Sequence, residues 1–174
     1  MKKIAIVGPS GAGKSTLARE LGDILQIPVY HLDSIYWKPG WIPSSRDEFA
    51  QIHHKIITKE QWIIDGTYIQ TIEIRFMHAD TIIFLDLPRV TCLYRVLKRW
   101  GRYWQKNRPD MGKDCPEKLD FPFLKWIWNY PKKIRPKILA KLQEYANSDT
   151  DQKQVFILRS ANEISHLLKN ARQT

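Results

Sequence analysis

The chain has 174 residues, of which 43% are hydrophobic and 26% charged, so it is long enough for one compact domain and too apolar for intrinsic disorder. Its two cysteines, Cys92 and Cys115, exclude a disulfide scaffold and, without a CxxC pair, a zinc ribbon. No apolar run reaches the roughly 18 residues of a membrane span, and the N-terminal one is too short for a signal peptide. We therefore expect a cytoplasmic protein without a membrane partner.

The net charge of +10 is concentrated in one part of the chain. Residues 89–141, which we call the basic segment, contain 15 Lys and Arg against four acidic residues, a net charge of +11, whereas the remaining residues together carry −1. Four of the seven tryptophans also lie in the basic segment. Such a segment attracts nucleotide phosphates, nucleic acid or an anionic membrane. A solvated pair of helices with a small aromatic core is the purely structural alternative.

Hydrophobic patterning predicts strands and helices in alternation. Apolar runs predict strands over residues 3–7, 29–32, 61–64, 81–85 and 155–158. Helical spacing, capping residues and prolines predict helices over residues 17–25, 45–59, 70–77, 88–100 and 162–169, with one or two more ending at residue 146. Residues 37–45 contain the prolines and the glycine of a loop.

This alternation predicts a doubly wound α/β fold, a parallel five-stranded sheet with helices on both faces, in a single domain over residues 1–174. Such sheets bind ligands at the carboxyl ends of their strands. The first predicted strand ends in a Gly-rich loop, and the next three end at Asp33, Asp65 and Asp86. We therefore expect the active site at this edge of the sheet.

The loop after the first strand carries the pattern G-x-x-x-x-G-K-[ST] of a phosphate-binding (Walker A) loop, in the required place between a strand and a helix. Its glycines let successive backbone N–H groups turn toward an anion, and the helix adds the positive end of its dipole. We expect Lys14 to reach the β- and γ-phosphates of ATP and Ser15 to bind the bridging magnesium ion. The residues expected to bind ATP are Gly8, Pro9, Ser10, Gly11, Ala12, Gly13, Lys14, Ser15 and Thr16.

The three carboxylates predict different roles. Asp65 ends an apolar strand, which is the pattern of a Walker B aspartate that orders magnesium. Asp33 ends the neighbouring predicted strand and is expected to accept the proton of an attacking hydroxyl or to fix the acceptor. Either could instead cap a helix. For Asp86, which precedes Leu87 and Pro88, a strand-to-helix cap is the favoured interpretation.

The basic segment opens with a row of arginines. Arg95, Arg99 and Arg102 recur at helical spacing and share one helix face with Lys98. An arginine row beside a Pro-rich segment suits a lid that closes over a transferring phosphate, so residues 101–125 are expected to form a lid or insert. A solvated basic face is the alternative. The residues expected to form the opposite, core-facing stripe are Val90, Leu93, Tyr94 and Leu97.

Other features give less specific signals. Trp37 and Trp41 fit either the wall of an acceptor pocket or the core. His53 is expected at the surface or at a helix cap rather than in a metal site. Cys92 is expected in the core and Cys115 in a loop, without a visible role.

Taken together, these residues are similar to those of small P-loop phosphotransferases of the adenylate kinase-like and shikimate kinase-like group. The chain more specifically resembles the bacterial FlaR-like proteins known as DNA topology modulation proteins, which belong to the adenylate kinase-like P-loop NTPases. The stretches that carry this resemblance are His31–Trp41, Trp62–Gly66, Ala79–Arg89, Arg108–Glu117 and Phe123–Lys137. The resemblance implies a kinase-like core with a doubly wound five-stranded sheet. It implies no substrate, because the family name describes a phenotype.

Two departures from the better-known kinases bear on the acceptor. Adenylate kinases follow the third strand with Asp-Gly-Phe-Pro-Arg, whose arginine grips the acceptor monophosphate, but here no arginine follows Asp65-Gly66 before Arg75. Shikimate kinases carry paired acids in the second strand, whereas here His31 replaces the first acid. The first departure argues against a nucleoside monophosphate as the acceptor.

The sequence thus predicts an ATP- and magnesium-dependent phosphotransferase acting on a small hydroxyl or phosphate acceptor. The alternative from another class is a nucleic-acid-associated ATP-binding protein, and a third is a nucleotide-binding regulator without turnover. The kinase hypothesis predicts that the basic segment faces the phosphate loop, whereas the nucleic-acid hypothesis predicts an exposed stripe away from it. The expected catalytic residues are Lys14, Asp33, Arg95 and Arg99, and the expected metal ligands are Ser15 and Asp65.

Overall fold

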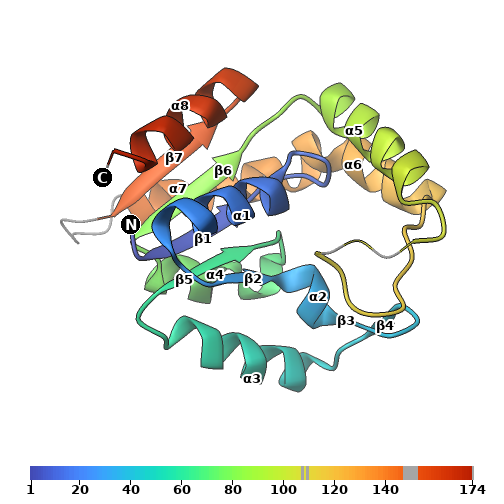
Figure 1. Cartoon of the computed structure of the whole chain (residues 1–174), viewed down its shortest axis with the longest axis horizontal. Coiled ribbons are helices and arrows are strands. Elements are labelled where there is room, and N and C mark those ends of the chain that lie inside the picture. The colour runs from blue at the N-terminus through green and yellow to red at the C-terminus, as the bar shows by residue number, and fades with distance from the viewer. Residues whose placement is uncertain (107, 109, 147–152, 174) are drawn as a thin grey trace.

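The computed structural model describes residues 1–106, 108, 110–146 and 153–173 (Figure 1). Its centre is a five-stranded sheet in the order β2-β5-β1-β6-β7, in which all neighbouring strands are parallel. These strands are β1 (Lys3–Val7), β2 (Val29–His31), β5 (Trp62–Asp65), β6 (Thr81–Leu85) and β7 (Gln154–Leu158). The helices are α1 (Lys14–Leu25), α2 (Leu32–Tyr36), α3 (Arg46–Ile57), α4 (Ile69–His78), α5 (Arg89–Arg102), α6 (Phe121–Lys133), α7 (Arg135–Ala146) and α8 (Ala161–Ala171).

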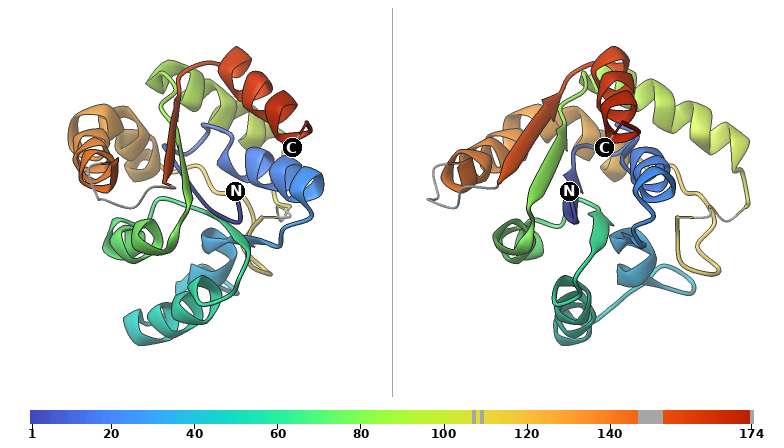
Figure 2. Two further views of the ribbon diagram at one scale, coloured as in Figure 1. Left: turned by 90° about the vertical axis from the view of Figure 1, so that its left-hand side faces the viewer. Right: turned by 60° about the vertical axis from the view of Figure 1, so that its left-hand side comes forward.

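Helices cover both faces of the sheet, because successive side chains of each buried strand point to opposite faces. On one face, Ile4 and Ile6 of β1 pack with apolar residues of α1 and α8. On the other face, Ala5 and Val7 pack with residues of α3, α4 and α7. The sheet lies between these two layers when viewed along its edge (Figure 2). The predicted doubly wound α/β fold is therefore confirmed.

The segment after the second strand differs from the prediction. β2 ends at His31, and Leu32 and Asp33 belong to the first turn of the short helix α2 rather than to the strand. The predicted loop over residues 37–45 contains a two-stranded antiparallel hairpin, β3 (Trp37–Lys38) and β4 (Ile42–Pro43). Its turn uses Gly40 with φ 76°, a left-handed conformation that costs glycine little. The correction matters because it moves Asp33 from a strand end to a helix start.

The core-facing stripe predicted for α5 is also wrong, except at Leu93, which is partly buried and packs against the core. Val90, Tyr94 and Leu97 are exposed, by 66%, 63% and 46%, whereas the fully buried residues of the helix are Cys92 and Val96. The apolar stripe and the arginine row do lie on opposite sides of α5. The two buried residues, Cys92 and Val96, lie between these two sides. Helix α5 extends past the end of the sheet (Figure 1), so only this narrow side packs against the core.

Two residues of the predicted lid, 107 and 109, lie outside the described residues. Among the helices of the described ranges, none combines the length and the apolar character that crossing a bilayer requires.

Candidate active site

The phosphate loop connects β1 to α1 at the carboxyl edge of the sheet, as the sequence predicted. A Cβ atom on Gly8 would lie 2.6 Å from the carbonyl oxygen of Leu85, and one on Gly11 would lie 2.3 Å from that of Cys92. Both glycines also have positive φ angles, 148° and 82°. Side chains are therefore excluded at these positions twice over, by backbone conformation and by contact with β6 and α5. This close approach brings α5 directly against the loop.

Thr67, which the sequence analysis did not single out, anchors the start of the loop. Its hydroxyl accepts a hydrogen bond from the backbone N–H of Gly8 at 2.9 Å and donates one to the carbonyl oxygen of Gly8 at 2.7 Å. Thr67 follows the Asp65-Gly66 strand end, so the loop is tied to the next strand of the sheet. The only signal in the sequence was a small hydroxyl residue directly after the predicted Walker B strand.

Lys14 and Ser15 open α1 with their side chains toward the carboxylates. The Nζ of Lys14 donates to the carbonyl oxygen of Pro9 at 3.0 Å, so the side chain lies back over its own loop. Burial lowers the pKa of Lys14, and the negative charges of Asp33 and Asp65 oppose that shift. The hydroxyl of Ser15 donates to Oδ2 of Asp65 at 2.8 Å. The two expected metal ligands are therefore in direct contact.

Asp65 is buried and held from its other side by His31. The Nδ1 of His31 lies 2.5 Å from Oδ1 of Asp65. Burial works against protonation of His31, but the hydrogen bond and the charge of Asp65 raise its pKa above the ordinary value. The replacement of an acid by His31, noted in the sequence, thus supplies a close polar partner that orients Asp65.

Hard oxygen donors are the ligands that magnesium prefers, and it commonly takes only one or two of them from protein, with substrate phosphates and waters completing the shell. The Ser15 hydroxyl and the Asp65 carboxylate fit that requirement. Within the described ranges, no cluster of three or more His, Cys, Asp or Glu could hold a metal ion. The arrangement is of the kind that binds magnesium together with a nucleotide.

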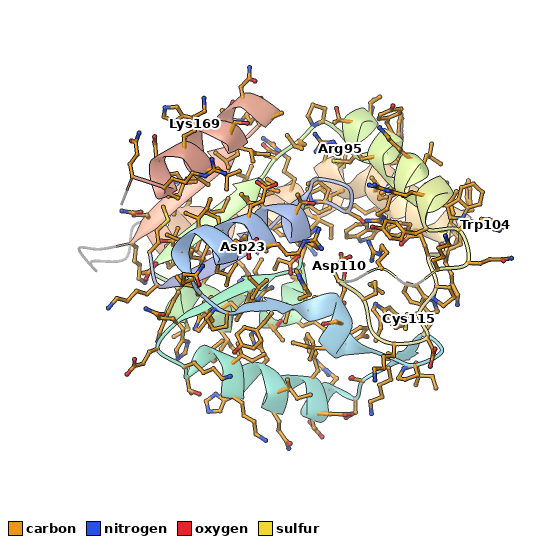
Figure 3. The ribbon with its side chains drawn as sticks, in the orientation of Figure 1. Asp23, Arg95, Trp104, Asp110, Cys115 and Lys169 are labelled. Atoms are coloured by element: carbon orange, nitrogen blue, oxygen red, sulfur yellow. The ribbon has the colours of Figure 1, made fainter. Side chains whose placement is uncertain are left out.

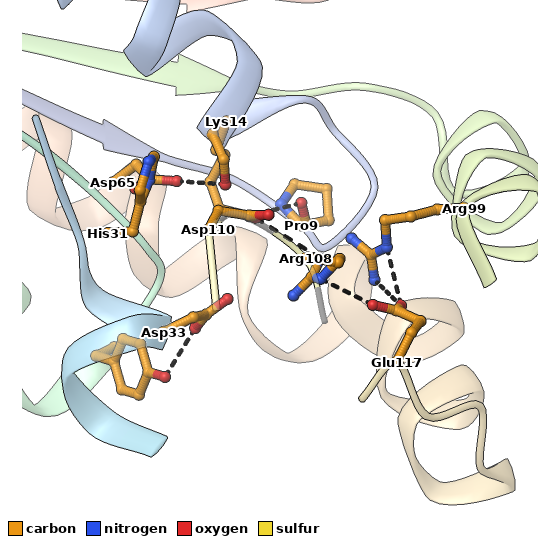
Figure 4. Close-up of polar contacts among 11 residues, drawn as sticks. Pro9, Lys14, His31, Asp33, Asp65, Arg99, Arg108, Asp110 and Glu117 are labelled. Atoms are coloured by element: carbon orange, nitrogen blue, oxygen red, sulfur yellow. Dashed lines mark hydrogen bonds and ion pairs between the residues drawn. The ribbon is translucent and has the colours of Figure 1, made fainter. Parts of the chain in front are cut away.

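Asp33 lies at the start of α2, across from the phosphate loop (Figure 4). Its Oδ1 accepts a hydrogen bond from the hydroxyl of Tyr68 at 2.8 Å. Burial, with the charge and hydrogen bond of Asp33, raises the pKa of Tyr68, so this phenol stays a donor. Asp33 is thereby fixed in direction while it still lines the cavity described next.

A cavity of about 580 Å³ runs from the phosphate loop to α5 and α8. Its lining is strongly cationic and includes five arginines and two lysines: Arg19, Arg95, Arg99, Arg102, Arg108, Lys14 and Lys98. Nη1 of Arg95 donates to the carbonyl oxygen of Ala12 at 3.2 Å, which places this guanidinium on the loop itself. The arginine row therefore faces the phosphate loop, as the kinase hypothesis predicted.

Arg99 and Arg108 share one carboxylate, that of Glu117. Nε and Nη2 of Arg99 lie 2.9 Å and 2.8 Å from Oε1, and Nε of Arg108 lies 2.8 Å from Oε2 (Figure 4). Asp110 from the same segment lines the same cavity as Ser15 of the phosphate loop (Figure 3). Burial opposes ionisation of Asp110, but the positive charge of Arg108 lowers its pKa. The sequence analysis assigned no individual role to Arg108, Asp110 or Glu117.

The predicted lid continues from Asp110 to a tight contact with the β3–β4 hairpin. The carbonyl oxygen of Pro116 accepts a hydrogen bond from Nε1 of Trp41 at 3.1 Å, and the Sγ of Cys115 donates to the carbonyl oxygen of Lys38 at 3.3 Å. A Cβ on Gly112 would lie 2.3 Å from the carbonyl oxygen of Trp37. Trp41 thus holds the lid segment, and Cys115 is a buried contact residue rather than one without a role.

Three further predicted residues have structural partners. Asp86 does not cap α5, whose N-cap is Pro88; its carboxylate forms a bidentate ion pair with Arg135, both distances being 2.8 Å. Arg75 is fully buried and donates to the carbonyl oxygen of Gly66 at 2.7 Å, so it supports the strand end rather than gripping an acceptor. His53 is 1% exposed and stacks on a ring of the core, which corrects its expected surface position.

The sheet order and the phosphate loop define the class of the fold, that of the P-loop NTPases. Among solved structures, the shikimate kinase from Acinetobacter baumannii in complex with shikimate is similar over 99% of this chain and 92% of its own, with a TM-score of 0.57 and 18% identity. A gluconokinase from Sinorhizobium meliloti 1021 is similar over 99% of this chain and 90% of its own, with a TM-score of 0.53 and 15% identity.

These likenesses show a fold shared with P-loop kinases. No family model matches the chain, and the search of curated proteins finds no match, so the resemblance to FlaR-like proteins stays a prediction. The comparisons give no support to the nucleic-acid alternative.

Proposed function

We propose that this protein is an ATP- and magnesium-dependent phosphotransferase that phosphorylates a hydroxyl group of a small acceptor. The observation that carries the proposal is the single cavity in which the phosphate loop, the guanidinium groups of α5 and the carboxylate of Asp33 face one another. Guanidinium groups directed at a phosphate loop match the charge that spreads over a phosphoryl group during transfer. A nucleotide-binding regulator would have no need of Asp33 on the acceptor side.

In this proposal, residues 8–16 hold the phosphates of ATP through backbone N–H groups, and Lys14 turns from Pro9 to the β- and γ-phosphates. Magnesium, bound by Ser15 and ordered by Asp65, would neutralise charge on the same phosphates. The chain's contribution is position: His31 and Ser15 hold Asp65 by 2.5 Å and 2.8 Å contacts, so its carboxylate does not have to reorganise.

Asp33 acts on the acceptor. The acceptor oxygen forms a bond to the γ-phosphorus while the bond to the bridging oxygen of ADP breaks, and the hydroxyl proton passes to the carboxylate of Asp33. The hydroxyl of Tyr68 holds that carboxylate from the other side at 2.8 Å. Arg95 and Arg99 stabilise the charge on the transferring group. Residues 101–125 act as the lid, within a single domain over residues 1–174.

The experiment is a screen for ADP release with polyols, sugars and nucleoside monophosphates as acceptors. We expect an acceptor without phosphate to raise ADP release at least about tenfold over ATP alone. Asp33→Asn should then lower turnover by about 10²-fold to 10⁴-fold, the range for a lost general base, with ATP affinity nearly unchanged. ATP binding without stimulation by any acceptor, and with Asp33→Asn equal to the parent, would support a regulator instead.

A further inference from the structure

Glu117 lies behind the cavity and does not line it. Its side chain is 3% exposed, and both of its oxygens are occupied by guanidinium groups that do line the cavity. Arg99 approaches Oε1 with two nitrogens and Arg108 approaches Oε2, so one carboxylate sets the direction of two arginines (Figure 4). Ion pairs this short restrict where the two guanidinium groups can lie.

The backbone around Glu117 is also held. Its N–H donates to the carbonyl oxygen of Lys106 at 3.2 Å, and it forms a bridge with Trp104 just beyond the end of α5. The carboxylate is therefore fixed relative to the helix that carries Arg99, although the two residues are 18 positions apart in the chain. A carboxylate on a loose loop could not orient the arginines in this way.

The charges explain why such a residue is needed. Burial lowers the pKa of Arg99, and the positive charge of the nearby Arg108 lowers it further. The negative charge of Glu117 opposes both effects. Without a negative charge between them, the two cations would repel each other and turn away from a common target. The carboxylate of Asp110 lies 3.7 Å from Nη1 of Arg108, farther than the 2.8 Å that separates Oε2 of Glu117 from Nε of the same arginine.

We propose that Glu117 is a positioning residue that holds Arg99 and Arg108 as a preformed pair directed at the transferring phosphate. The inference rests on the proposed phosphotransferase function and deepens it. Glu117 touches neither nucleotide nor acceptor and acts through the two arginines. Loss of the Glu117 carboxylate should therefore weaken stabilisation of the transition state, which depends on the direction of the two guanidinium groups. ATP binding should suffer less, because removing a negative charge makes the cavity more positive and so favours the phosphates.

The test compares Glu117→Gln, which keeps the shape and removes the charge, with Glu117→Asp, which keeps the charge and shortens the side chain. Glu73→Gln is the matched control, because Glu73 pairs with Lys141 at 2.8 Å and lies outside the cavity. We expect Glu117→Gln to lower kcat by about 10-fold to 100-fold, the range for residues that orient catalytic groups, with ATP affinity equal or tighter. The control should match the parent in both.

A double variant makes the test specific. If Glu117 acts through the two arginines, then Glu117→Gln added to the double variant Arg99→Ala with Arg108→Ala should lose no more than about threefold in kcat beyond that double variant alone. The inference would be overturned if the kcat losses of the combined variant multiplied. It would also be overturned if Glu117→Gln weakened ATP binding as much as it lowered kcat. If Glu117→Gln does not fold, parental kcat in Glu117→Asp overturns it, and a reduced kcat with parental ATP affinity supports it. A parent protein that binds ATP but never releases ADP would overturn the proposed function itself.

Discussion

Replacement of Thr67 by valine tests whether a residue outside the phosphate loop holds that loop in its shape. Valine has nearly the same shape but lacks the hydroxyl that both accepts from and donates to the backbone of Gly8, at 2.9 Å and 2.7 Å. Gly8 is buried, so both of its backbone groups lose a partner. Since each unsatisfied buried group costs about 1–3 kcal/mol, the free energy of unfolding should fall by about 2–6 kcal/mol.

The same substitution should weaken ATP binding by about tenfold or more, because the start of the loop is no longer held in the shape that receives phosphate. Urea unfolding and equilibrium titration with ATP measure the two effects on one preparation. Thr67→Ser is the control, since it retains the hydroxyl and should stay within about 1 kcal/mol of the parent. Parental stability and parental ATP affinity in Thr67→Val would refute this account of the loop.

Three further predictions follow from single contacts. Lys14→Ala should abolish ADP release and leave the far-ultraviolet circular dichroism unchanged; turnover at the parental rate would contradict the loop assignment. Arg95→Ala should lower turnover by about 10²-fold, and Arg95→Lys should restore little of it because an ammonium group lacks the planar fork; steady-state kinetics decides. Burial, with the nearby positive charge of Arg75, lowers the pKa of His53 from 6.5 to about 4, so only the unfolded chain gains this proton as the pH falls. Stability should therefore decrease from about pH 6.5 toward pH 4 by up to about 3 kcal/mol, and acid unfolding of His53→Gln should lack that part of the slope.

The fold could be predicted because its signals are local. Buried parallel strands are short apolar runs, and the alternation of strands with helices leaves few arrangements for a sheet covered on both faces. The phosphate loop could also be predicted, because its chemistry depends on residues adjacent in the chain, from Gly8 to Ser15. The second strand was predicted one residue too long, since an apolar run such as Val29–Leu32 does not show where extended backbone becomes helical.

Contacts between distant residues could not be predicted. Glu117 lies 18 positions after Arg99, and Thr67 lies 59 positions after Gly8, so no spacing rule relates either pair. The exposed stripe of α5 was misassigned for the same reason. Amphipathic spacing separates the faces of a helix, but it does not tell which face meets the rest of the molecule when the helix extends beyond the sheet.

The sequence by itself therefore determined the class of fold, the nucleotide-binding loop and the residue types that gather at the carboxyl edge of the sheet. Only the tertiary structure decided that the arginine row turns inward, that Asp33 starts a helix held by Tyr68, and that Glu117 lies between two arginines. The physical reason is range. Backbone conformation and hydrophobic periodicity act over a few residues, whereas the direction of a charged side chain depends on whichever partner the folded chain brings within about 3 Å of it.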